Sequence, residues 1–175
     1  MQKPLFLFIS LTTLSALASA QVSTPSAQQL KGITPQRALQ LANAWKGTRV
    51  QSFVTDTAIQ FTFPDSSKQS IPLPAKQMVV AIAPYVNQTH PCQTHFMSSC
   101  QGELVNTPVK VQVSNAAGKT IMNKTVKTLP NGFLELWLPR NQMYNVTLSA
   151  QGKSVKGQIQ TFKGAQTCIT NLRLQ

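Results

Sequence analysis

Residues 108–150 read PVKVQVSNAAGKTIMNKTVKTLPNGFLELWLPRNQMYNVTLSA, and this stretch decides the fold class. Apolar and polar residues alternate in four segments with Gly, Pro or Asn turns between them: Val109–Val113, Ile121–Thr128, Phe133–Leu138 and Tyr144–Ala150. A period of two predicts strands with one buried face, and turns every ~8–12 residues are typical of a small sandwich. Val155–Phe162 and Cys168–Leu174 continue the pattern. We therefore predict an antiparallel β-sandwich over about residues 103–175.

A different pattern precedes the sandwich. Thr34-Pro35 places a capping hydroxyl before a proline, and apolar residues then follow with helical spacing, which predicts a helix to about Lys46. Three segments with strand patterning come next: Val50–Val54, Ala58–Phe63 and Gln69–Leu73. Met78–Ala83 is apolar on both faces and favours a buried strand, with a short helix as the alternative. The predicted fold class is thus α+β, with a small N-terminal α+β domain at 21–88, a junction at 89–102 and the sandwich.

The N-terminus carries an export signal. Lys3 precedes an apolar run, Leu5–Leu17, and Ala18-Ser19-Ala20 suits a signal peptidase. We predict a signal peptide over residues 1–20 and an exported product with no stable membrane anchor, because no second run of spanning length follows.

The charge balance argues against several functions. Sixteen Lys and Arg accompany only four acidic residues, which gives a formal net charge of +12. The cations are spread along the chain, so the pattern predicts a positive surface but no nucleic-acid groove. Paired-carboxylate glycosidases and Ser-His-Asp hydrolases are disfavoured, because acids are scarce and both histidines lie in one Cys-rich segment. GxGxxG and P-loop motifs are absent from the sequence, which argues against nucleotide cofactors.

One short segment concentrates the reactive side chains. Residues 90–100 read HPCQTHFMSSC and hold both histidines and two of the three cysteines. The third cysteine, Cys168, lies in the last predicted strand, which could pack beside the junction. Thiols and imidazoles are soft or borderline donors that fit Cu(I) or Zn(II) and do not fit Ca²⁺ or Mg²⁺. The candidate metal ligands are therefore Cys92, Cys100, Cys168, His90 and His95.

Two other interpretations of these cysteines stay open on the residues alone. An odd cysteine count in an exported protein is also typical of one disulfide, such as Cys92–Cys100, plus a free thiol. Thiol–disulfide redox chemistry is the second alternative. The two histidines beside Cys92 favour a metal site, since a stapling disulfide has no use for imidazoles. Glu103 is either a carboxylate that orients a histidine or a solvated turn residue.

At this point the sequence resembles the CueP family of periplasmic copper-binding proteins of Gram-negative bacteria. The resemblance rests on five stretches: Ala83-Pro84-Tyr85, Thr89 to Cys92 with His95, Cys100 to Leu104, Asn131 to Phe133 with Leu136 to Pro139, and Thr167 to Thr170. It covers essentially the whole chain after the predicted signal peptide. The cysteine spacing of eight and then sixty-eight positions is its most specific feature.

The resemblance implies a periplasmic protein, not an enzyme, that holds Cu(I) through Cys92, Cys100 and Cys168. The thiol and imidazole donors leave zinc as a second candidate metal. It further implies supply of copper to periplasmic Cu/Zn superoxide dismutase, a contribution to copper resistance, and a homodimer formed through the N-terminal part. The resemblance does not settle whether His90 or His95 ligates.

Two rival functions remain. The first is a thiol-dependent Cu(II) reductase, which would be consumed stoichiometrically unless a thiol–disulfide reductant recycled it. The second is an exported interaction module with a structural disulfide.

Overall fold

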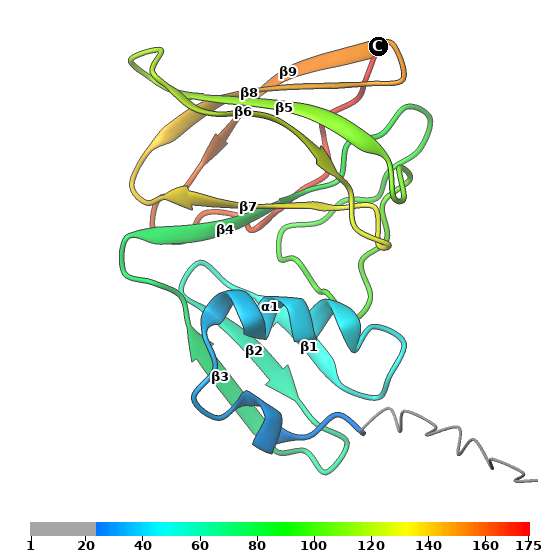
Figure 1. Ribbon diagram of the computed structural model, residues 1–175, viewed down its shortest axis with the longest axis vertical. Coiled ribbons are helices and arrows are strands. Elements are labelled where there is room, and N and C mark those ends of the chain that lie inside the picture. Colours follow the sequence, from blue (N-terminus) through cyan, green and yellow to red (C-terminus); the bar gives the residue numbers. More distant parts are fainter. Residues whose placement is uncertain (1–23) are drawn as a thin grey trace, which may run out of the picture.

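The computed structural model describes residues 24–175, so the predicted signal peptide at 1–20 lies outside the described residues. A 3₁₀ turn and one helix precede ten strands (Figure 1). Their bounds are η1 Ala27–Leu30, α1 Pro35–Ala44, β1 Gln51–Val54, β2 Ala58–Thr62, β3 Lys68–Pro72, β4 Gln77–Ile82, β5 Pro108–Asn115, β6 Thr120–Lys127, β7 Leu134–Pro139, β8 Met143–Ala150, β9 Lys153–Gln160 and β10 Cys168–Ile169.

Helix α1 begins as the sequence predicts. Thr34 is the N-cap, its hydroxyl accepts a hydrogen bond from the backbone N–H of Arg37 at 3.2 Å, and Pro35 occupies the first helical position. The helix buries Ala38, Leu39 and Ala42, which share one face because they are three and four positions apart. That face packs with the apolar side of the β1-β2-β3 sheet.

The remaining strands form the two sheets of a sandwich. One sheet has the order β6-β5-β8-β9 and the other β10-β4-β7. Alternate residues of β5, β7 and β8 are buried and share one core with the inner residues of β4. The predicted α+β class with a C-terminal sandwich is therefore confirmed.

Strand β4 lies in the middle of the molecule, between the helix-bearing layer and the four-stranded sheet (Figure 1). Val80 and Ile82 belong to the sandwich core, whereas Val79 belongs to the core of the helix layer. This is why its sequence is apolar on both faces, and the preferred strand prediction holds. The central strand of the smaller sandwich sheet therefore comes from the segment before residue 88, although the predicted domain boundaries themselves stay a prediction.

The C-terminal segment differs from its prediction in extent and direction. Only Cys168–Ile169 of the expected Cys168–Leu174 is a strand, and it pairs in parallel with Ala81 and Ile82 of β4. The chain beyond returns as a single parallel bridge between Tyr85 and Arg173. The parallel pairing of β10 with β4 requires a long connection between the two strands, because a tight hairpin joins only antiparallel strands. None of the helices in the described part of the chain is long and apolar enough to cross a membrane.

Candidate metal centre

The Cys/His segment is an irregular connection between β4 and β5 that is fastened to the helix layer. The backbone N–H of Val54, at the end of β1, donates to the carbonyl of His95 at 2.9 Å. The hydroxyl of Thr167 accepts from the N–H of His95 at 3.0 Å and donates to the carbonyl of Val54 at 2.7 Å. His95 is thereby held by β1 on one side and by the residue before Cys168 on the other.

Two glycines allow the segment to approach the sandwich closely. The N–H of Gly102 donates to the carbonyl of Asn131 at 2.7 Å. A Cβ atom at Gly132, whose φ is +78°, would lie 2.5 Å from the carbonyl oxygen of Gly102. Any side chain here would collide with backbone, so the chain just after Cys100 needs this glycine pair.

Cys168 reaches the same place from the other end of the chain. Its backbone N–H donates to the carbonyl of Gln93 at 3.1 Å, and its Cα pairs with that of Ala81. The cysteines share a small buried cluster with Ala81, Ala83 and Phe133. Ala81 of β4 and Ala83 just after it occupy little volume beside the sulfur atoms.

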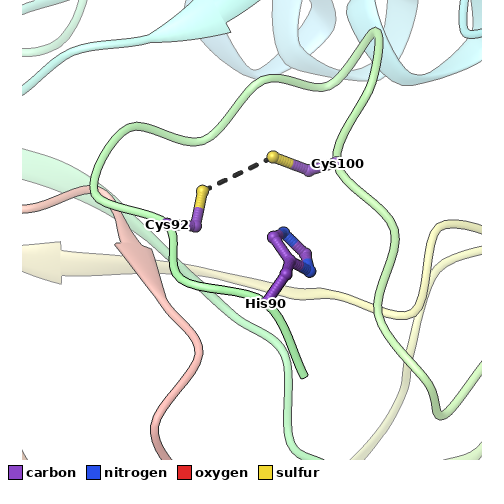
Figure 2. Close-up of side chains that lie close together, drawn as sticks. All are labelled: His90, Cys92 and Cys100. Atoms are coloured by element: carbon purple, nitrogen blue, oxygen red, sulfur yellow. Dashed lines mark hydrogen bonds between the residues drawn. The ribbon is translucent and has the colours of Figure 1, made fainter. Parts of the chain in front are cut away.

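The first candidate metal site, here the outer group, comprises His90, Cys92 and Cys100. Their ligand atoms lie within 4.8 Å of one another, and the Sγ atoms of Cys92 and Cys100 are 3.5 Å apart. Figure 2 shows the imidazole of His90 pointing toward the two sulfur atoms. The outer group lines an open pocket of ≈ 560 Å³, so it can meet an ion arriving from solvent.

The second candidate site, here the inner group, comprises His95, Cys100 and Cys168, whose ligand atoms also lie within 4.8 Å of one another. All three residues are buried, and His95 and Cys168 are 0 % exposed. Cys100 belongs to both groups. The five predicted ligands are thus gathered into two adjoining sites; their role as ligands stays a prediction.

The three thiols do not share one protonation state. The pKa of Cys100 is lowered from 9.0 to about 3, chiefly by its hydrogen bond with Cys168 and further by His95, against the opposing effect of burial. Burial raises the pKa of Cys92 to about 11. The pKa of Cys168 is also raised, first by its hydrogen bond with Cys100 and then by burial. Cys100 is therefore the thiol that loses its proton first, and a thiolate is the reactive form of cysteine.

The charge of Cys100 also affects His95. Burial disfavours a charged imidazole, but hydrogen bonds with Cys100 and Glu135 outweigh it, so the pKa of His95 is raised. The ring of Phe133 lies 4.5 Å from that of His95, centroid to centroid. The ring of His95 is thus flanked by an aromatic side chain, a carboxylate and a sulfur atom.

Glu135 is the site residue that sequence reasoning missed. Its Oε1 lies 3.1 Å from Nε2 of His95, and its side chain is only 10 % exposed. The available signal was an acidic residue between Leu134 and Leu136 in a strand, in a chain with only four acids. A carboxylate among apolar neighbours is usually partnered.

Among the described residues Glu103 has no hydrogen bond with a histidine, and its bonds instead favour the turn role. Its carboxylate accepts from the backbone N–H groups of Val86 and Asn87, at 2.6 Å and 3.0 Å, and from the Asn87 side chain. It holds the turn that leads into the Cys/His segment. Met97 is fully buried in the helix-layer core and packs there.

Comparison with known proteins agrees with the chemistry of this centre. A family model described as periplasmic copper-binding protein CueP matches residues 37–173. A crystal structure described as that of S.CueP superposes with a TM-score of 0.79 and 29% sequence identity, covering 87% of this chain and 100% of that one. A search of curated proteins gave no match.

Proposed function

Since the chain belongs to the CueP family of periplasmic copper-binding proteins, we propose that it holds Cu(I) through the thiolates of Cys92, Cys100 and Cys168 and passes it to a partner by ligand exchange. The observation that carries this proposal is the sharing of Cys100 by two adjoining Cys/His groups. Cu(I) is soft and prefers sulfur ligands, and a second group beside the first gives the ion a place to move.

The two groups suggest an order of events. Copper enters through the open pocket and meets the outer group first, where His90 offers an imidazole that suits Cu(II) as well as Cu(I). It then moves past Cys100 to the inner group, where burial keeps competing water away. Release to a partner reverses this path, so the outer group is also the exit.

The ligand set is tested by a Cu(I) competition titration against a chelator of known affinity. We expect reduced protein to bind about one Cu(I) per chain and Cys168→Ser to weaken binding strongly. The matched control is Met97→Leu, which removes a buried sulfur outside both groups. Unchanged affinity in Cys168→Ser would exclude the three-thiolate site.

We further propose that the acceptor is periplasmic Cu/Zn superoxide dismutase and that the protein contributes to copper resistance. The test mixes Cu(I)-loaded protein with copper-free dismutase and follows dismutase activity. Loaded protein should activate the enzyme faster than an equal concentration of chelated copper. Equal rates of activation would contradict delivery to the dismutase, while the proposal that the protein binds copper would still stand. For resistance, cells lacking the protein should stop growing at lower copper concentrations than cells complemented with it.

A second candidate function, Cu(II) reduction, is favoured by the 3.5 Å separation of the Cys92 and Cys100 sulfur atoms. Two thiolates give one electron each to two Cu(II) ions, an S–S bond forms, and two Cu(I) ions result. Thiols that begin protonated release their protons to water. A Cu(I)-specific chromophore assay beside a thiol titration should therefore give two Cu(I) for two thiols lost. Equal Cu(I) formation by a cysteine-free variant would contradict this function.

Continued reduction requires a thiol–disulfide reductant, which we propose as a second partner class.

Three thiols and an imidazole also form a donor set that Zn²⁺ accepts, so zinc is a candidate second metal. Competition between Zn²⁺ and Cu(I) for the reduced protein measures that preference. Sedimentation of the full chain tests the predicted homodimer.

A further inference from the structure

A row of polar side chains links helix α1 to the inner group. Nδ2 of Asn43, in the last turn of α1, lies 2.8 Å and 2.9 Å from the two carboxylate oxygens of Glu135 in β7. Oε1 of Glu135 lies 3.1 Å from Nε2 of His95. Asn43 itself is fixed by Asn131, whose Nδ2 donates to its Oδ1 at 3.1 Å. Three elements far apart in sequence thus converge on one imidazole.

The contacts of Asn43 determine which of its side-chain atoms donates a hydrogen bond and which accepts one. Oδ1 of Asn43 accepts a hydrogen bond from Asn131. Nδ2 of Asn43 donates to the carbonyl of Leu39 at 3.1 Å as well as to Glu135. The amide group of Asn43 is therefore used at both of its atoms and cannot turn without loss. It presents an N–H to the carboxylate and holds that carboxylate in place.

The carboxylate in turn determines which nitrogen of His95 carries a proton. An ionised carboxylate only accepts hydrogen bonds, so the Nε2 atom facing Glu135 must be the N–H donor. In the neutral imidazole the other nitrogen, Nδ1, then keeps its lone pair. Among residues 24–175, Nδ1 of His95 is one of two buried side-chain nitrogen or oxygen atoms without a hydrogen bond of good geometry, and the neighbour that it can interact with is the sulfur of Cys100. An acceptor without such a bond in a buried Cys/His cluster is in the state that a metal requires.

We propose that Glu135, braced by Asn43 of α1, is a positioning residue that fixes His95 as the Nε2–H tautomer and so offers Nδ1 to copper. This inference rests on the proposed copper function. It assigns the buried His95, rather than the half-buried His90, as the imidazole whose tautomer is fixed before copper binds. It also makes helix α1 part of the metal centre, although α1 supplies no ligand.

A purely structural role is the alternative for this row, because buried polar groups need partners in any protein. The two roles differ in what they predict for the imidazole. A structural role needs only that Glu135 and His95 be satisfied, with either nitrogen protonated. A positioning role needs one tautomer before copper arrives and a loss of copper affinity when that tautomer is released.

The first experiment observes the tautomer directly in reduced, copper-free protein labelled with ¹⁵N-histidine. The chain has two histidines, so each spectrum contains the His95 imidazole and that of His90 as an internal reference. Because the pKa of His95 is raised, the spectra are recorded at alkaline pH, where the ring is neutral. We expect His95 to be the Nε2–H tautomer there and Cu(I) addition to shift its Nδ1 signal. An Nδ1–H tautomer in the copper-free protein would overturn the inference without any variant being made.

The second experiment measures Cu(I) affinity in Glu135→Gln and Asn43→Ala. Outer partners of metal-bound histidines typically contribute ~10–100-fold in affinity, and we expect losses in this range, larger for Glu135→Gln because a glutamine amide can donate to Nε2 and reverse the tautomer. Glu103→Gln is the matched control, since Glu103 is a partly buried carboxylate that binds backbone N–H groups instead of a histidine.

The outcomes separate the inference from the function on which it rests. Failure of the unaltered protein to bind Cu(I) would contradict the proposed function, whatever the tautomer. Normal binding in the unaltered protein with unchanged affinity in both variants would overturn the positioning role. Equal losses in Glu103→Gln would also overturn it, because they would indicate a general structural effect. A selective loss in Glu135→Gln together with a mixed tautomer in its spectrum supports it.

Discussion

The outer and inner groups have similar donors but are held differently. The outer group lines an open pocket and takes its imidazole from His90, which is half-buried at the edge of an irregular segment. The inner group is buried; the main chain of His95 is held by hydrogen bonds, and its imidazole contacts Phe133 and Glu135. An accessible group suits exchange of an ion with a partner, and a buried, braced group suits its retention. The comparison shows that two neighbouring groups with similar donors differ in burial and in the contacts around them.

The largest effect is expected where the two groups meet. Cys100→Ser removes the shared sulfur and the thiolate, so both groups lose a ligand at once. We expect a loss of Cu(I) affinity beyond the ~10–100-fold of an outer contact, and a larger loss than in Cys92→Ser or Cys168→Ser. A competition titration of the three variants ranks them. A Cys100→Ser loss no larger than the other two would mean that the groups do not share a ligand.

The two histidines provide the next comparison. His95→Ala should lower equilibrium Cu(I) affinity more than His90→Ala, because His95 is the buried and pre-oriented donor. His90→Ala should instead slow copper uptake and transfer. Stopped-flow loading kinetics beside equilibrium titration separate these effects. The opposite ranking in both measurements would reverse the roles given to the two groups.

The glycine contact behind Cys100 tests how far the sites depend on the sandwich. Gly132→Ala places a Cβ 2.5 Å from a backbone oxygen in addition to an unfavourable positive φ, whereas Gly118 has the same φ of +78° with open space around it. We expect Gly132→Ala to lower the free energy of unfolding by about 1–3 kcal/mol and Gly118→Ala by less. Denaturant unfolding measures both. Equal losses would show that the close approach is relieved easily.

The smallest expected signal is the titration of one thiolate in copper-free protein. The pKa of Cys100 is lowered from 9.0 to about 3, so its contribution to stability is fully present above pH 9 and is lost as pH falls toward 3. The raised pKa of Cys168 acts oppositely, and its contribution is lost as pH rises. Ultraviolet thiolate absorbance should persist at neutral pH and disappear only in acid. Cys168→Ala should move that transition upward, because it removes the hydrogen-bond donor that is the chief cause of the shift.

Much of the fold could be predicted because its signals are local. Thr34-Pro35 begins a helix by capping chemistry, and the alternation in Tyr144–Ala150 places a strand with one buried face. The both-sided apolar character of β4 also pointed to burial. The local pattern could not show what packs against each face of β4. Val79 belongs to the core of the helix layer and Val80 to the core of the sandwich.

The sequence by itself determined the candidate donors: the clustering of Cys92, Cys100 and both histidines points to soft metals, thiol redox or a disulfide, because donor type is a property of the side chain. Only the tertiary structure decided the rest. The parallel pairing of β10 with β4 brings Cys168 to the other thiols, and the meeting of α1 with β7 places Asn43 and Glu135 behind His95. These contacts join residues far apart in the chain, and a protonation state or a tautomer depends on distances that spacing along a sequence does not contain.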